Sequence, residues 1–199
     1  MTQIIAITLP YQFEGEAEEI ERLLDMGIDR IHIRKTGNNG REETEELISN
    51  ISENYYSRIS LHYFPEIAVK YSTGGIHYSP KTGNEAIDWN GMRSASCHTL
   101  EEVIEKAEYD YVLLSPIFDS ISKEGYRSTF DIATLKHAAE KGIIGQRTYA
   151  LGGIKPEHMP LIEEIGFGGA AILGGLWGDA NDGKIAERAK AYLDAAKRK

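Results

Sequence analysis

Apolar and polar positions along the chain form eight repeating units. Each unit begins with a short apolar or alternating run of strand length, and a longer segment with polar positions follows it. The runs lie at about residues 3–9, 30–34, 58–62, 75–78, 92–96, 110–114, 147–151 and 169–173. Strands that alternate with helices over short connections predict a parallel sheet covered by helices. Eight units favour closure into a single α/β (β/α)8 barrel, the TIM barrel, and a doubly wound open sheet is the alternative.

Two of the intervening segments carry clear helical stripes. One stripe is Leu100, Val103, Ile104 and Ala107, and the other is Ile185, Ala189, Tyr192, Leu193 and Ala196. Two other helices are expected to be poor. Residues 84–90 leave room for barely two turns, and Pro160 makes the start of the seventh helix irregular because proline has no N–H to donate.

Size and charge narrow the possible functions. A chain of 199 residues that is 41% hydrophobic can bury one core, so we expect one domain over residues 1–199. The formal charge of -9 disfavours general attraction to nucleic acid or to an anionic membrane. With no basic leader, no membrane-spanning apolar run and only Cys97 as cysteine, a cytoplasmic protein is expected. The acidic runs 14–21 and 42–46 are interpreted as solvated helix faces.

Two Gly-Gly pairs follow the last two predicted strands. Gly152-Gly153 comes after the seventh strand and Gly174-Gly175 after the eighth. A phosphate oxygen can approach backbone N–H groups closely where no Cβ stands in the way. In (β/α)8 barrels the loops after strands seven and eight commonly bind phosphate, so these glycines predict a phosphate site.

The second strand places polar side chains inside the expected barrel. Residues two apart share a face of a strand, so His32 and Arg34 point inward while Ile31 and Ile33 point to the helices. A buried arginine without a partner costs several kcal/mol. Arg34 lies at the carboxyl end of a strand, where ligands bind in this fold, so we expect it to bind a ligand anion; pairing with a nearby acid of the protein is the alternative.

Four histidines lie on or just after the second to fifth strands and can converge on one pocket. They are His32, His62, His77 and His98, and Ser94 and Ser96 share the inward face of the fifth strand. A zinc hydrolase is therefore an alternative interpretation, although no His-x-His pair is present and no Asp ends the eighth strand. Cys97 and His98 are neighbours on an extended strand and point to opposite sides, so a thiol dyad is not expected. The loop 118–126 contains Lys123 and is a candidate lid over an anion.

Together these motifs resemble the thiamin phosphate synthase/TenI family over nearly the whole chain. The segments that carry the resemblance are His32-Ile33-Arg34, Gly75-Ile76-His77, Ser96-Cys97-His98-Thr99, Ser115-Pro116-Ile117-Phe118, Gly152-Gly153-Ile154 and residues 169–175. The resemblance implies thiazole phosphate at the barrel mouth, a role in thiamin biosynthesis and a homodimer. The family has two known activities. The synthase joins an aminopyrimidine diphosphate to thiazole phosphate with magnesium, and an isomerase of the TenI branch transfers a proton on a thiazole carboxylate phosphate.

The chain departs from both patterns. The synthase motif Gln-x-Arg-x-Lys appears as His32-Ile33-Arg34-Lys35-Thr36, and its magnesium carboxylates after strands three and four are replaced by His62-Tyr63-Phe64 and Ser79-Pro80-Lys81-Thr82. Glu66, Glu85 or Asp88 would have to substitute for them. The TenI histidine after strand six is replaced by Pro116, and Lys123 matches the diphosphate-binding lysine of the synthase.

We therefore expect a TenI-like isomerase that needs no metal or other cofactor. Arg34, Ser96 and the four glycines would bind a thiazole phosphate or a related phosphorylated small molecule. His98, or failing that His32 or His62, would act as general acid and base. Lys123 is a further catalytic candidate, on the synthase pattern. The alternatives are a synthase with a rearranged magnesium site and a non-catalytic thiazole-phosphate binding or regulatory protein.

Overall fold

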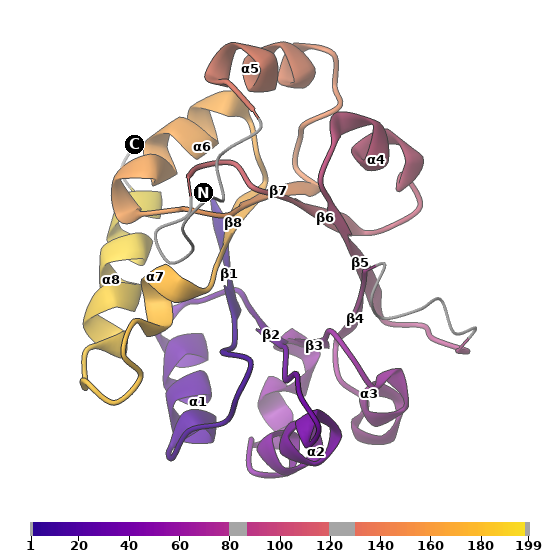
Figure 1. Cartoon of the computed structure of the whole chain (residues 1–199), viewed down its shortest axis with the longest axis vertical. Helices are drawn as coiled ribbons and strands as arrows, with labels where there is room; N and C mark the ends of the chain where they lie inside the picture. The colour runs from indigo at the N-terminus through magenta and orange to yellow at the C-terminus, as the bar shows by residue number, and fades with distance from the viewer. Residues whose placement is uncertain (1, 80–86, 120–129, 198–199) are drawn as a thin grey trace.

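Eight parallel strands close into a barrel in the order β1 to β8 (Figure 1). The computed structural model describes residues 2–79, 87–119 and 130–197. The strands are β1 (Gln3–Ile7), β2 (Arg30–Ile33), β3 (Ile59–Leu61), β4 (Gly75–Tyr78), β5 (Met92–Cys97), β6 (Tyr111–Leu114), β7 (Thr148–Leu151) and β8 (Gly169–Ile172). Pairing of β1 with β8 completes the ring, so the predicted (β/α)8 barrel is confirmed and the open sheet is excluded.

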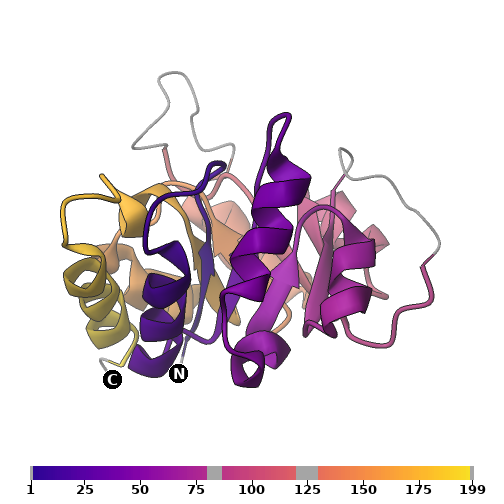
Figure 2. The same ribbon diagram turned by 90° about the horizontal axis from the view of Figure 1, so that it is seen from below.

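Helices surround the barrel on its outer side (Figures 1 and 2). They are α1 (Glu16–Met26), α2 (Gly40–Ser49), α3 (Pro65–Tyr71), α4 (Leu100–Glu105), α5 (Ile132–Glu140), α6 (Met159–Ile165), α7 (Gly174–Trp177) and α8 (Ile185–Ala196). Short 3₁₀ segments span Glu53–Arg58 and Pro156–His158. The second of these precedes α6, as Pro160 predicts. Residues 87–90, the described part of the segment 84–90, are not helical.

The stripe on α8 packs against the barrel, whereas the stripe on α4 does so only in part. The five predicted positions of α8 are all buried, and so is Val103 of α4. Ile104 is 56% exposed, and α4 ends at Glu105, before Ala107. The α4 prediction was therefore wrong over its second turn, because the helix is too short to carry the whole stripe.

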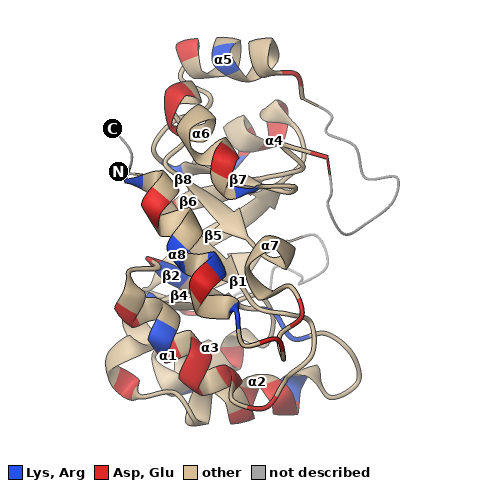
Figure 3. Cartoon of the chain, turned by 90° about the vertical axis from the view of Figure 1, so that its left-hand side faces the viewer, with Lys and Arg blue, Asp and Glu red and all other residues tan. Residues whose placement is uncertain are grey.

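Charged residues lie along the outer helices, including the acidic residues of α1 and α2 (Figure 3). Strand residues that face the helices, such as Ile31 and Ile33, are fully buried in the outer core. Within the described residues, no helix is both long and apolar enough to span a bilayer.

Candidate active site at the barrel mouth

Three histidines from neighbouring strands meet inside the barrel. His32 lies on β2, His62 directly follows β3 and His77 lies on β4. The His32 Nδ1 and His62 Nε2 atoms are 2.9 Å apart, and the His62 and His77 rings stack with their centroids 4.0 Å apart. All three are buried, so the predicted inward direction of His32 and the predicted convergence are confirmed for these residues.

Hydroxyl groups contact two of the three imidazoles. His32 Nε2 lies 2.5 Å from the Tyr111 hydroxyl oxygen. His77 Nδ1 lies 2.9 Å from Ser94 Oγ, and its Nε2 lies 2.8 Å from Ser96 Oγ. Ser96 thus lies on the polar inner wall that its strand position predicts. Sequence analysis did not identify Tyr111, although its alternation with the buried Leu113 on β6 already indicated an inward side chain.

The three imidazoles are held in the neutral form. Burial is the largest cause and lowers the pKa of His32 and of His62 well below the usual value, with neighbouring positive charge acting in the same direction. Burial, followed by the charge of Arg34, lowers the pKa of His77 to about 3. These side chains therefore present nitrogen lone pairs at neutral pH.

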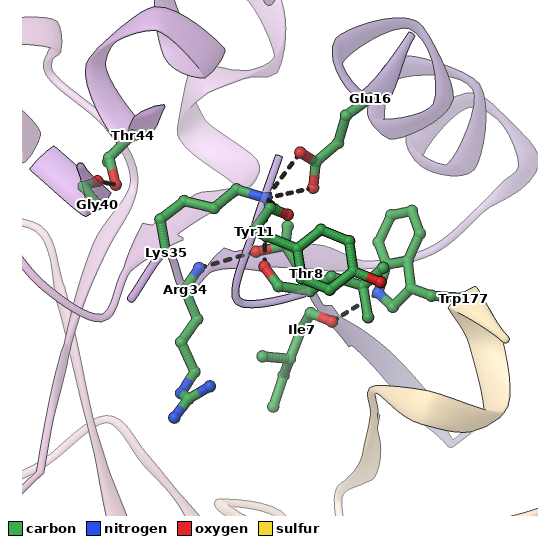
Figure 4. Close-up of polar contacts among 10 residues, drawn as sticks. Ile7, Thr8, Tyr11, Glu16, Arg34, Lys35, Gly40, Thr44 and Trp177 are labelled. Atoms are coloured by element: carbon green, nitrogen blue, oxygen red, sulfur yellow. Dashed lines mark hydrogen bonds and ion pairs between the residues drawn. The ribbon is translucent and has the colours of Figure 1, made fainter. Parts of the chain in front are cut away.

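Arg34 and Lys35 follow β2 and point in different directions (Figure 4). The backbone N–H of Arg34 donates to Thr8 Oγ1 at 2.9 Å, and its side chain is half-buried. Its guanidinium makes no hydrogen bond or ion pair with a described residue, yet its charge lowers the pKa of both His62 and His77. Arg34 is therefore a cation near the histidine cluster that lacks an anionic partner among the described residues.

The Lys35 ammonium group instead binds protein oxygen atoms beneath α1. Its Nζ lies 2.7 Å from both carboxylate oxygens of Glu16 and donates to the carbonyls of Leu9 and Tyr11 at 3.2 and 2.8 Å. Both charged side chains are fully buried. Burial lowers the pKa of Lys35 and raises that of Glu16, while the attraction between them acts in the opposite direction. The interpretation of residues 14–21 as a solvated face was thus wrong for Glu16, and Lys35 is not available to a ligand.

His98 lies apart from the three buried histidines. It is exposed just after β5, and its Nδ1 lies 3.0 Å from the carbonyl oxygen and 3.3 Å from the hydroxyl oxygen of Ser115. In the tautomer that donates from Nδ1 to the carbonyl, the lone pair lies on Nε2. Cys97 is fully buried among the outer core residues, and burial raises the pKa of its thiol to about 11. A Cys97–His98 dyad is therefore absent, as expected.

The two glycine loops lie side by side at the ends of β7 and β8. Gly152 and Gly153 have φ values of +99° and +64°, and a Cβ on Gly153 would be 2.3 Å from the Asp119 carbonyl oxygen. A Cβ on Gly175 would be 2.2 Å from the hydroxyl oxygen of Tyr192. That hydroxyl donates to the Ile154 carbonyl at 2.8 Å.

Gly153 therefore allows the loop after β7 to pack against the segment after β6, and Gly175 leaves room for the Tyr192 side chain of α8. Gly174 is the exposed first residue of α7. Phosphate binding by the glycine loops stays a prediction.

The described residues that directly follow β3 do not fit magnesium. His62, Tyr63 and Phe64 follow β3, and none offers the carboxylate oxygen that Mg²⁺ prefers. Glu66 Oε1 lies 3.3 Å from Nε of Arg41 in a surface ion pair. Asp88 is exposed on the segment before β5. Glu85, Lys123 and most of the candidate lid lie outside the described residues.

Fold and mouth together define a TIM-barrel protein whose polar groups gather at the carboxyl ends of β2 to β5. Residues 4–176 match the family model for thiamine monophosphate synthase, TMP-TENI, and the chain belongs to this family. The predicted resemblance is thereby confirmed.

Individual relatives carry synthase names. A thiamine-phosphate synthase of Salmonella paratyphi A is 27% identical over 184 residues, which cover 85% of this chain and 87% of that protein. The crystal structure of a thiamine phosphate pyrophosphorylase from Bacteroides thetaiotaomicron has a TM-score of 0.86 and 32% identity, with 98% and 96% of the two chains covered. A thiamine phosphate pyrophosphorylase from Pyrococcus furiosus, at 18% identity, has a TM-score of 0.79 with 98% and 95% covered, and supports the fold alone.

Proposed function

We propose that this member of the thiamin phosphate synthase/TenI family is a TenI-like isomerase that transfers a proton on a thiazole phosphate. The observation that carries the proposal is the make-up of the wall at the ends of β2 to β4. The neutral imidazole of His62 stands after β3, where the synthase pattern has a magnesium carboxylate, and the neighbouring Arg34 has no anionic partner among the described residues. Proton transfer on an anionic substrate needs a side chain with a free lone pair and a cation that holds the substrate. Release of a diphosphate instead needs a hard cation such as Mg²⁺.

Each part of the mouth has a role in this reaction. The glycine loops after β7 and β8 would bind the phosphate, and Arg34 would pair with a carboxylate on the thiazole. His98 is the preferred acid and base, because its contacts with Ser115 both involve Nδ1 and its Nε2 has no partner among the described residues. His32 and His62 are less suited, since each is occupied by a bond to the other and burial strongly disfavours their protonated forms.

An isomerisation assay on thiazole carboxylate phosphate tests this proposal. His98→Gln should lower kcat by about 100-fold or more, since general acid–base catalysis contributes about 10²–10⁴-fold. His137→Gln, on the exposed face of α5, is the matched control and should retain full activity. Unchanged turnover in His98→Gln, His32→Gln and His62→Gln would refute the assignment. Tight binding of the ligand without turnover by the wild-type protein would instead mark a non-catalytic binding protein.

A second candidate is a thiamin phosphate synthase with a rearranged metal site. Two observations favour it: the names of the relatives, and the Ser115-Pro116-Ile117-Phe118 segment with Lys123, which follows the synthase pattern. The test is incubation with aminopyrimidine diphosphate and thiazole phosphate with and without magnesium. Product that forms only with magnesium would support the synthase and would replace the isomerase proposal.

A further inference from the structure

We propose that His32, His62 and His77 bind one divalent transition-metal ion of the zinc class, with an open ligand position toward Arg34. Each residue offers one ring nitrogen, and these nitrogens all lie within 4.8 Å of one another. The sequence offered a zinc site only as an alternative, because it contains no His-x-His pair and no Asp at the end of the eighth strand. The barrel supplies the same proximity from three adjacent strands.

The spacing suits a tetrahedral ion. Zn–N bonds of about 2.0–2.1 Å place the nitrogens of a tetrahedral site about 3.3 Å apart. The 2.9 Å separation between His32 Nδ1 and His62 Nε2 is slightly shorter than this, and the 4.8 Å limit for the cluster is longer. Small rotations about the side-chain bonds would therefore suffice, while the paired strands hold the backbones in place.

Hydrogen bonds outside the cluster orient two of the three ligands. When Nε2 of His32 donates to the Tyr111 hydroxyl, its Nδ1 carries the lone pair that a metal needs. The two serine hydroxyls beside His77 can hold one of its nitrogens as a donor once the other turns to the ion. A ligand set made of neutral imidazoles, with no carboxylate in the cluster, selects a borderline ion such as Zn²⁺ over Mg²⁺.

Three protein nitrogens leave a fourth position for a water or for a ligand. His62 is the most exposed of the three histidines, at 8%, and Arg34 is the neighbouring cation. Two positive groups at one side of the pocket favour an anionic oxygen donor, such as a carboxylate, that can bridge the ion and the guanidinium. The metal site does not rest on the proposed isomerase, and His98 stays free for proton transfer if an ion binds.

Zinc titration of the full chain after chelator treatment tests the site. Calorimetry, together with competition against a chromogenic chelator, should give one Zn²⁺ per chain. His62→Ala should weaken binding by at least about 100-fold, and Tyr111→Phe, which keeps all three ligands, by about 10-fold. His137→Ala, an exposed histidine on α5, is the matched control and should bind as the wild type does. Circular dichroism would establish that each variant is folded.

Cobalt(II) provides a readout on the wild-type protein alone, independent of how the variants fold. Intense visible absorption typical of tetrahedral cobalt, abolished by one equivalent of zinc, would support the site. Weak octahedral absorption would overturn it. So would zinc binding that is substoichiometric, or zinc binding that His62→Ala leaves unchanged.

Discussion

The barrel interior has a polar half and a more apolar half, whose Tyr111 hydroxyl reaches the histidine cluster. The polar half, from β2 to β5, is lined by His32, Ser60, His62, His77, Ser94 and Ser96. The other half, from β6 round to β1, is lined by Ile5, Ile7, Tyr111, Leu113, Tyr149 and Ala171, with Leu151 and Leu173 packed against them. Both halves use the same alternation of inward and outward positions. Histidine and serine side chains are therefore concentrated at one side of the barrel, while the glycine loops follow β7 and β8 on the other side.

Lys35 and Arg34 are adjacent cations that differ in their partners, and this difference gives the largest predicted effect on the free energy of unfolding. Lys35→Met should lower the free energy of unfolding by about 3–5 kcal/mol, because the buried Glu16 carboxylate loses its counter-charge. Arg34→Met should change it by less than about 0.5 kcal/mol, because no anion among the described residues is left unpaired. Urea unfolding of both variants measures the difference. Adding Glu16→Gln to Lys35→Met should recover much of the loss, and equal effects of the two single substitutions would contradict the assignment.

The glycine loops provide the next test. Gly153→Ala should destabilise the protein by about 2–3 kcal/mol, because the new Cβ meets the Asp119 carbonyl and φ is positive. Gly142→Ala is a matched control, since Gly142 has φ +73° with nothing within 4 Å of a Cβ. It should cost only the backbone strain, about 1 kcal/mol. Equal losses in urea unfolding would show that packing between the loops contributes little.

Acid should lower the free energy of unfolding through the buried histidines of the polar half. A histidine with a lowered pKa in the folded protein binds its proton more readily in the unfolded chain, so stability is lost as pH falls below the unfolded value. For His77 this window runs from pH 6.5 down to about 3. His77→Gln should therefore reduce the slope of unfolding free energy against pH by about 1.4 kcal/mol per pH unit. Urea titrations at pH 7.5, 6.0 and 5.0 would measure this, and an unchanged slope would refute it.

Strand positions and inward directions could be predicted from the sequence because they depend on local alternation. His32 inside the barrel, Ile31 and Ile33 against the helices and the irregular start of α6 follow from spacing and from proline chemistry. The pairing of Lys35 with Glu16 could not be predicted from the sequence, because it depends on how α1 packs against the segment after β2.

The contacts within the histidine cluster could not be predicted from the sequence either. Which ring atoms of His32, His62 and His77 meet depends on strand register and side-chain rotation. His98 shares the inward face of β5 in the sequence pattern, yet it lies after the strand ends and outside the cluster.

Calorimetric titration of the wild-type protein tests the proposed function most directly. Thiazole phosphate and thiazole carboxylate phosphate would each be titrated without magnesium, and aminopyrimidine diphosphate with it. The isomerase proposal predicts magnesium-independent binding of both thiazole ligands, with Arg34→Gln weakening mainly the carboxylate-bearing one. Magnesium-dependent binding of the diphosphate, or no binding of either thiazole ligand, would contradict it.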